Sequence, residues 1–229
     1  MRKALLLTVC MTLMAVGNPA FAQRDLRGGD IGPNPGMGYL SVIHAIPGLP
    51  EKVEVFVNGD FAFAFDYQDR IGPLALDAGY YQLQVRLQGV TVLSEKTRIL
   101  ADTNSTAIAH LTESSGIKLA VFENNLEGLD RGSSRLIVRH TAAAPEVTVT
   151  LQSTRSLGRD SRITIPGFAN GDQIGPVDIA AGDYSAGLSL DRVEVFNSGI
   201  FNLPSDATTV IYAIGEFPNT FELFVEEYR

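Results

Sequence analysis

Cysteine is nearly absent from this sequence, whose 229 residues contain one, Cys10. Cys10 lies in an apolar N-terminal segment that is predicted to be removed from the mature chain. The mature chain therefore has no thiol nucleophile and needs no disulfide. The absence of thiols suits an oxidising compartment.

Long apolar runs are scarce as well. The run from Ala4 to Val16 is shorter than the roughly 20 residues that span a bilayer, and no later run approaches that length. The basic pair Arg2-Lys3 precedes this run and the small-residue motif Ala20-Phe21-Ala22 follows it, a pattern typical of an export signal. We therefore expect cleavage after Ala22, a mature protein in the periplasm or the extracellular space, and no transmembrane segment.

Basic residues are outnumbered by acidic ones. Residues 1–22 hold two basic residues and no acidic residue, so the mature chain keeps 16 of the 18 basic residues and all 26 acidic ones, a net charge of −10. Nucleic acids bind clustered Lys and Arg, and anionic membranes attract polybasic segments. We therefore expect neither as a partner.

Motifs of catalysis and metal binding are also missing. The sequence contains no Gly-x-Ser-x-Gly elbow, no phosphate-binding glycine loop, no His-Glu-x-x-His and no Asp-x-Asp-x-Asp-Gly calcium loop. Glu226 and Glu227 are neighbours on an expected strand, where they face opposite ways and cannot act as a glycosidase pair. We expect no enzyme activity, no cofactor and no bound metal.

What the sequence does contain is the period-2 alternation of β-strands, which is clearest in residues 39–65. Three apolar positions alternate with other residues before a turn: Val53, Val55 and Val57. The dipeptide Asn58-Gly59 tolerates the positive φ of a two-residue hairpin turn, and Pro47, Gly48 and Pro50 break the chain before it. Three aromatic residues alternate with alanines on the return strand: Phe61, Phe63 and Phe65. This pattern predicts a β-meander.

The chain repeats this unit. Residues 40–44 match 136–140 at an offset of 96, whereas residues 71–73, 78–81 and 118–123 match later segments at an offset of 103. A near-constant offset over some 90 residues indicates a duplication. The change of offset places a seven-residue insertion in the second copy, between about residues 152 and 171.

Both copies show short strands, closely spaced turns and no helical period, which predicts an all-β fold of two tandem immunoglobulin-like β-sandwich domains, mostly antiparallel. Each copy has Ala-Gly-x-Tyr at the start of a strand, ending at Tyr81 and Tyr184, as in a tyrosine corner. We expect four segments: a signal peptide at 1–22, a flexible segment at 23–38, and β-sandwich repeats at 39–127 and 133–229.

These motifs resemble an exported bacterial family, the domain of unknown function 4397. The resemblance rests on His-Ala-x-Pro-x-x-Pro-x-Val-x-Val-x-Val-Asn-Gly from His44 through Pro47 to Asn58 and Gly59, followed by Leu-x-Ala-Gly-x-Tyr ending at Tyr81. A weaker copy runs from His140 through Tyr184, so the resemblance covers most of residues 39–227 as a tandem pair. It implies a secreted or envelope β-sandwich, and it implies no activity and no catalytic residues.

Three groups of residues remain as candidate sites. His44 and His140 end the first strand of each copy, where an imidazole either binds a metal or satisfies backbone groups left open at the end of the ladder, and the second alternative is favoured. Phe63 lies on a strand without a polar face, which is either buried or an aromatic surface for a ligand. The basic residues of the insertion, Arg155, Arg159 and Arg162, are either solvated or bind an anionic glycan or a partner's carboxylates.

The sequence thus predicts a non-catalytic, exported protein of the cell envelope, in which tandem sandwiches form a binding or structural module of unknown ligand. The alternative is a carbohydrate-binding accessory domain, and an envelope hydrolase is disfavoured. The expected partner is an envelope protein or a glycan, and the expected state is a monomer.

Overall fold

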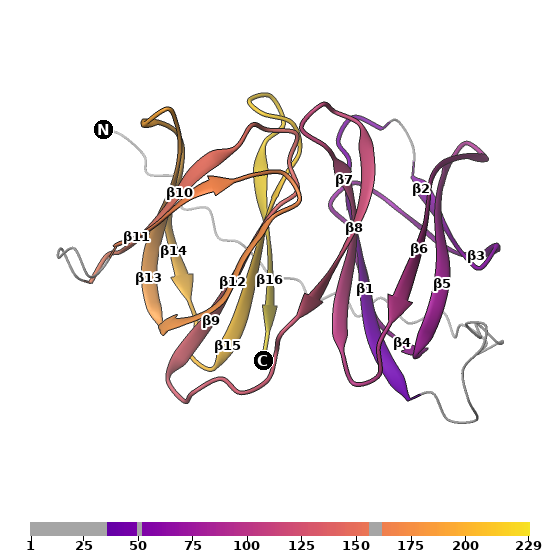
Figure 1. Ribbon diagram of the computed structural model, residues 1–229, viewed down its shortest axis with the longest axis horizontal. Coiled ribbons are helices and arrows are strands. Elements are labelled where there is room, and N and C mark those ends of the chain that lie inside the picture. Colours follow the sequence, from indigo (N-terminus) through magenta and orange to yellow (C-terminus); the bar gives the residue numbers. More distant parts are fainter. Residues whose placement is uncertain (1–35, 50–51, 156–161) are drawn as a thin grey trace, which may run out of the picture.

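The computed structural model describes residues 36–49, 52–155 and 162–229, and this part of the chain contains strands and no helix. The expected signal peptide and almost all of the expected 23–38 segment lie outside the described residues. The described strands form four sheets of four strands each (Figure 1). The expected all-β class is confirmed.

Eight strands lie in the first half of the chain: β1 (Met37–Ala45), β2 (Val53–Val57), β3 (Asp60–Phe65), β4 (Arg70–Asp77), β5 (Gly79–Leu87), β6 (Val90–Ile99), β7 (Asn104–Leu111) and β8 (Ile117–Asn124). Eight more follow: β9 (Ser133–His140), β10 (Val147–Ser153), β11 (Arg162–Phe168), β12 (Gln173–Ala180), β13 (Gly182–Leu190), β14 (Val193–Leu203), β15 (Ala207–Ile214) and β16 (Glu222–Tyr228).

The first sandwich pairs a sheet of order β4-β1-β7-β8 with one of order β3-β2-β5-β6, and the second pairs β12-β9-β15-β16 with β11-β10-β13-β14. The only parallel pairs among these sheets are β1 with β7 and β9 with β15. The predicted mostly antiparallel arrangement is therefore confirmed. The strand order differs from that of an immunoglobulin domain, because β1 pairs with β4 and β7 and not with β2.

The expected meander is wrong for its first turn. The segment around Pro47 carries the chain from the sheet of β1 to the facing sheet of β2, so the two strands do not pair. The second turn is as predicted: Asn58 and Gly59 both have positive φ, 53° and 92°, and join β2 to β3.

The two sandwiches repeat each other in detail. The hydroxyl of Tyr81 donates to the carbonyl oxygen of Asp77, and that of Tyr184 to the carbonyl oxygen of Ala180, each over 2.8 Å. These bonds are those expected of a tyrosine corner. Gly72 and Gly175 also correspond, and a side chain at either position would collide with the carbonyl oxygen of Leu40 or Leu136 at about 2.6 or 2.5 Å.

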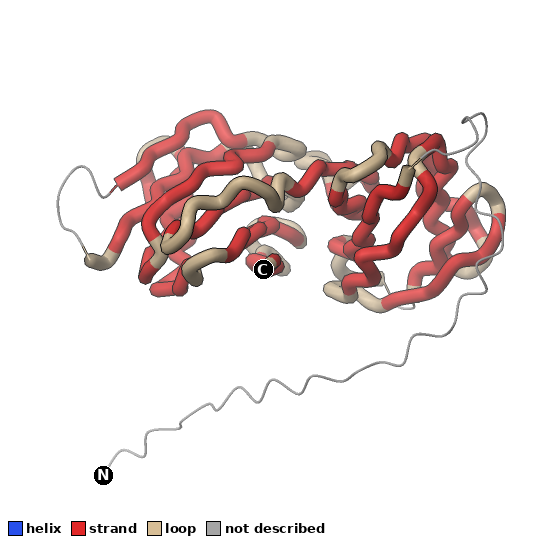
Figure 2. Tube along the Cα trace, turned by 90° about the horizontal axis from the view of Figure 1, so that it is seen from below, coloured by secondary structure: helices blue, strands red, loops and turns tan. Residues whose placement is uncertain are grey.

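The sheets containing β1 and β9 face each other, so the molecule has four β-layers in a row (Figures 1 and 2). A cluster of buried apolar residues from both sheets fills this interface: Ile43, Ala45, Ile108, Ile137, Val210, Tyr212 and Ile214. Polar contacts cross it as well: Arg70 pairs with Glu226, and the Tyr67 hydroxyl donates to Glu222 over 2.6 Å. The interface is thus packed as a core and fixes one sandwich against the other.

Candidate functional site

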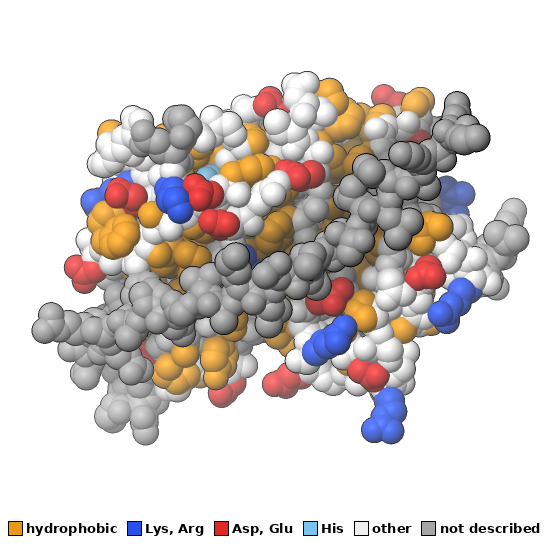
Figure 3. All heavy atoms as spheres, turned by 180° about the vertical axis from the view of Figure 1, so that it is seen from behind, with side chains coloured by type: hydrophobic (Ala, Val, Ile, Leu, Met, Phe, Trp, Pro, Cys, Tyr) orange, Lys and Arg blue, Asp and Glu red, His pale blue; other side chains and the backbone are white. Residues whose placement is uncertain are grey.

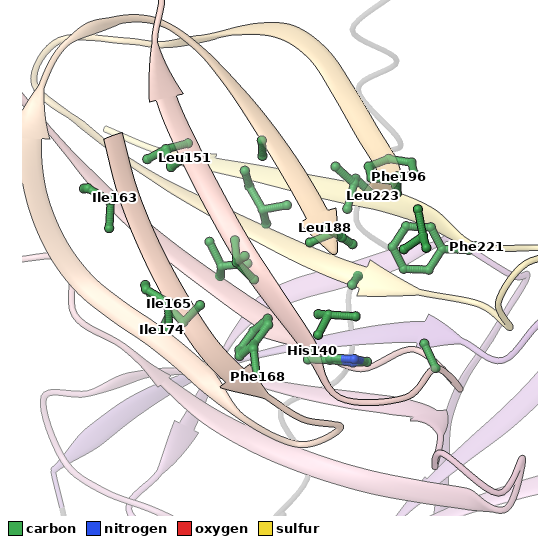
Figure 4. A pocket seen from close by; sticks show the side chains of 18 of the residues that line it. His140, Leu151, Ile163, Ile165, Phe168, Ile174, Leu188, Phe196, Phe221 and Leu223 are labelled. Carbon is green, nitrogen blue, oxygen red and sulfur yellow. The ribbon is translucent and has the colours of Figure 1, made fainter. Parts of the chain in front are cut away.

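The second sandwich contains an apolar cavity between its two sheets. It has a volume of about 80 Å³ and is lined by residues from all eight strands of this sandwich and from the loops around Pro145 and Phe217. Figure 4 shows Ile163 and Phe221 on opposite sides of the cavity, with His140 and Phe168 side by side at its base. Two lining residues at the edge, Ile163 and Val177, are 39% and 37% exposed, so the cavity is accessible from solvent.

Smaller side chains in the second copy explain the cavity. In the first sandwich, Phe63 and Leu83 are buried in the core. In the first sandwich Phe63 pairs with Val55, and in the second Ile165 pairs with the equivalent Val149, so Ile165 replaces Phe63. The repeat offset of 103 likewise places Ala186 where Leu83 lies. Both replacements remove apolar volume from the same sheet, on the two strands that flank β10. A cavity of this size costs about 2 kcal/mol of stability relative to a filled core.

The edge of the second sandwich is also more open. Strands β6 and β8 approach each other at one edge of the first sandwich, and the equivalent strands β14 and β16 do so less closely. Phe196 and Phe221 lie on that side of the second sandwich with their ring centroids 4.9 Å apart. Aromatic side chains, Phe196 and Phe221, therefore line the cavity at this edge of the sandwich.

His140 is the one lining residue with an ionisable side chain, and it is only 2% exposed. Its Nε2 lies 3.4 Å from the carbonyl oxygen of Pro145, and its ring packs on Phe168 with centroids 5.4 Å apart. Nδ1 has no hydrogen-bond partner among the described residues. Burial lowers the pKa of His140, although the Pro145 carbonyl and the Asp172 carboxylate act in the opposite direction. The imidazole is therefore neutral at pH 7.

His44, the equivalent residue of the first sandwich, has a different environment. Its ring packs on Phe65 with centroids 5.5 Å apart, and its Nδ1 accepts a hydrogen bond from the backbone N–H of Ile46 over 3.2 Å. Burial lowers the pKa of His44 to about 4. Nδ1 of the duplicated histidine thus accepts a backbone hydrogen bond in the first copy, whereas in the second it is buried without a partner among the described residues.

The third histidine, His110, is fully buried at the end of β7. One ring nitrogen, Nδ1, donates to the carbonyl oxygen of Leu111 over 2.8 Å, and burial lowers the pKa to about 4. No group of three metal-ligating side chains comes together in the described ranges.

Phe63 is not available as a ligand contact. Its side chain is 8% exposed and packs edge-on against Phe65, with centroids 5.4 Å apart. The aromatic surface proposed from the sequence is therefore corrected to Phe61, which is 57% exposed. A bulge between Val55 and Phe56 turns Phe61 to the outer face of its sheet, where its ring lies 5.7 Å from that of Phe56.

The basic insertion is described only in part. Arg155 and Arg162 are exposed at the end of β10 and the start of β11, and Arg159 lies outside the described residues. The guanidinium of Arg155 lies against Gly182, next to the tyrosine corner. Figure 3 shows basic and acidic side chains scattered over the visible face of the molecule, without a large area of one sign.

Sequence reasoning missed the cavity and its lining residues Ala186 and Ile165. The signal lay in the aligned repeats, where Leu83 corresponds to Ala186, but a difference in volume predicts a cavity only when the opposite sheet fails to fill it.

The fold defines the class of protein: two β-sandwiches in tandem, the second of which contains an apolar cavity. The sequence profile of one family, "Domain of unknown function (DUF4397)", matches residues 38–150, the family that the sequence motifs resemble. The match covers all eight strands of the first sandwich and reaches into β10, short of the expected limit at residue 227. No curated protein matches the chain. None of the described residues forms a helix of the length and apolarity that crossing a membrane requires.

Proposed function

We propose that this protein is a non-catalytic, exported binding module of the cell envelope, and that its second sandwich binds an aliphatic ligand in the cavity beside His140. The cavity carries this proposal. Apolar clefts with a few polar groups are the usual form of small-molecule sites, and this one lies where Phe63 and Leu83 fill the corresponding part of the first sandwich.

Export and the absence of catalysis are supported by the sequence. The N-terminal pattern ending at Ala22 is that of a cleaved signal, and the sequence carries no nucleophile motif. Fractionation of the host cell tests the location: the chain should begin at Gln23 and occur in the periplasm or the medium. A cytoplasmic protein that retains residues 1–22 would contradict this part of the proposal.

Calorimetric titration of residues 23–229 with 1-octanol tests the binding site. Ala186→Leu restores the residue that fills the first sandwich and should abolish binding by occupying the cavity. Ser189→Leu adds a similar side chain to the same strand, at a residue that does not line the cavity, and should bind as the parent does. Failure of the parent protein to bind 1-octanol would refute the proposed function.

A second candidate function, carbohydrate binding, is favoured by the exposed ring of Phe61. It stands next to Phe56, whose ring is covered by the Arg86 guanidinium at 3.8 Å, and Arg86 donates to Gln84 over 3.1 Å. Exposed aromatic rings flanked by amide and guanidinium groups suit sugar rings and their hydroxyls. Co-sedimentation with envelope polysaccharide should then weaken in Phe61→Ala and persist in Tyr39→Ala, a variant of another exposed aromatic residue.

The glycan or carboxylate partner expected at the basic insertion is tested in the same assay. Arg155→Ala combined with Arg162→Ala should weaken co-sedimentation if the insertion is the contact. Retention of binding in this double variant and its loss in Phe61→Ala would assign the contact to the first sandwich.

A further inference from the structure

We propose that the outer face of the sheet β3-β2-β5-β6 binds an acidic polysaccharide, whose sugar rings contact Phe61 and whose carboxylates pair with Lys96 and Arg98. The inference rests on the second candidate function, carbohydrate binding, and extends it to a ligand class and a set of contacts. It is independent of the cavity in the other sandwich. Three observations support it: a line of side chains across the sheet, an excess of cations on this face, and the contrast with the second sandwich.

This sheet is the last of the four layers, so no other sheet of the described chain covers its outer face (Figures 1 and 2). Alternate residues of a strand point to opposite faces. The core residues of β5 point inward, so the residues between them and their partners on β6 share the outer face: Tyr80, Gln82, Gln84, Arg86, Thr91, Ser94, Lys96 and Arg98.

Strand register places four outward side chains in one line across the sheet. Phe61 of β3 pairs with Phe56 of β2, and their rings lie 5.7 Å apart. Phe56 pairs in turn with Gln84 of β5, and Gln84 with Ser94 of β6. Neighbouring strands are about 4.8 Å apart, so the line is about 14 Å long. A single sugar cannot contact both ends of this line, whereas a polysaccharide laid across the strands can.

Amide and hydroxyl groups occupy the part of this face between the rings and the cations. The side-chain amide of Gln82 donates to the hydroxyl of Ser94 over 3.0 Å, and the guanidinium of Arg86 donates to Oε1 of Gln84 over 3.1 Å. A glutamine amide has two N–H donors and an oxygen with two lone pairs, so each one keeps hydrogen-bonding capacity beyond these contacts. Such groups match sugar hydroxyls, which both donate and accept.

The charge on this face is opposite to that of the whole chain. The outward positions of the four strands hold one acid, Glu54, and three cations: Arg86, Lys96 and Arg98. Asp60 and Glu95 lie on the other face by register, because each pairs with a buried core residue. The face therefore has an excess of two positive charges on a mature chain whose net charge is −10. This local excess favours an anionic ligand.

Two of these cations are held at the ring of Tyr80. Nζ of Lys96 lies 4.7 Å and the guanidinium carbon of Arg98 lies 5.6 Å from the ring centroid, distances at which a cation is attracted to the ring. Both side chains are exposed, and neither has an ion-pair partner among the described residues. A carboxylate that binds here meets two cations in one place without displacing another acid.

The second sandwich lacks this combination. The tyrosine corners and the strand register align the two outer faces, and the second copy has another residue at each ring or cation: Thr150 for Phe56, Asp183 for Tyr80, Ser189 for Arg86, Ile200 for Lys96 and Asn202 for Arg98. The fold therefore does not require rings and cations on this face. Their joint occurrence in the first copy is what a ligand surface needs.

The experiment compares three polymers by calorimetric titration of residues 23–229. Polygalacturonate carries sugar rings and carboxylates, dextran carries sugar rings without charge, and polyglutamate carries carboxylates without sugar rings. We expect polygalacturonate to bind about tenfold more tightly than either of the others, because two exposed ion pairs and the ring contact act together only in this polymer.

Two variants separate the contacts. Lys96→Gln combined with Arg98→Gln should lower the affinity for polygalacturonate about tenfold, to that for dextran. Phe61→Ala should weaken the binding of both polysaccharides. The matched control is Arg131→Gln combined with Arg192→Gln, which removes two exposed positive charges elsewhere on the chain and should bind as the parent does.

The outcomes distinguish this inference from the proposed functions. Equal affinity for polygalacturonate and dextran would overturn the acidic ligand class and leave carbohydrate binding at Phe61. Equal affinity for polygalacturonate and polyglutamate, or an equal loss in the control variant, would show that charge alone is recognised and overturn the site. Binding of none of the polymers would overturn this inference together with the carbohydrate candidate, whereas binding of 1-octanol would still support the cavity.

Discussion

Arg139 donates a hydrogen bond from Nη1 to the hydroxyl of Tyr212 over 2.6 Å, in a position without solvent exposure. Its Nη2 donates to the carbonyl oxygen of Glu123 in the first sandwich over 3.0 Å, and the guanidinium lies over the ring of Phe122 at 4.6 Å. Tyr212 in turn donates to Glu226 over 2.9 Å. One buried cation therefore joins the two sandwiches through a continuous polar network.

Replacing this cation should uncouple the sandwiches. In Arg139→Met the hydroxyl of Tyr212 and the carbonyl of Glu123 lose their donor inside the interface, and the buried Glu226 loses a nearby positive charge. Breaking a buried charged network costs about 3 kcal/mol or more. We expect urea unfolding to change from one transition to two, with the second sandwich unfolding first.

Arg98→Met provides the control, because Arg98 is exposed on the outer sheet of the first sandwich. Its free energy of unfolding should stay within about 0.5 kcal/mol of that of the parent. An Arg139→Met variant that unfolds in a single transition at the parent's midpoint would contradict a coupling role for this residue.

The buried histidines should make stability depend on pH. Burial lowers the pKa of His44 and of His110 to about 4, from an ordinary value near 6.5. Between pH 6.5 and 4 the unfolded chain therefore binds more protons than the folded one, so stability is complete above pH 6.5 and falls as the pH drops toward 4. Each histidine contributes a slope of about 1.4 kcal/mol per pH unit within this window.

Urea unfolding at pH 7, 6, 5 and 4.5 measures this slope. His44→Asn should lower stability at pH 7 but make the dependence on pH shallower, because one proton-binding site is removed from the unfolded chain. A free energy of unfolding that is constant from pH 7 to 4.5 would rule out this account.

The two tyrosine corners offer a pair of equivalent substitutions. Tyr81→Phe and Tyr184→Phe each remove a 2.8 Å hydrogen bond to the carbonyl oxygen four residues upstream while keeping the ring. We expect each to lower the free energy of unfolding by about 1 kcal/mol. Tyr39→Phe, at an exposed ring, should change it by less than half of that. Unfolding by urea at pH 7 compares the three, and equal values for all three would show that the corner bonds contribute nothing.

Much of the fold could be predicted from the sequence because its signals are local. Alternating valines, the Asn58-Gly59 turn and the repeated Ala-Gly-x-Tyr motif depend on the backbone conformation of a few residues, and the structure places each as expected. The pairing of β1 with β4 and β7 could not be predicted, since an alternating strand reads the same whichever neighbour it has.

The site was harder to predict than the fold. The alternation of Phe61, Phe63 and Phe65 predicted one common face, but a one-residue bulge beside Phe56 moved Phe61 to the other. Whether Nδ1 of His140 finds a hydrogen-bond donor depends on where the loop after β9 places its backbone N–H groups, and no N–H of the described residues reaches it. The equivalent loop of the first sandwich supplies the N–H of Ile46 to His44, so identical residues at equivalent positions have different hydrogen-bond partners.

Exchanging Leu83 and Ala186 between the copies should change the free energy of unfolding in opposite directions. Leu83→Ala empties a closed core and should lower the free energy of unfolding by about 2–5 kcal/mol. Ala186→Leu fills an existing cavity and should raise it by about 1 kcal/mol, because the added methyl groups enter space that is already open. Urea unfolding measures both changes, and Ser189→Leu controls for adding apolar volume to β13 away from the cavity. If Ala186→Leu were as destabilising as a substitution that overpacks a filled core, the space beside Ala186 would be closed in solution.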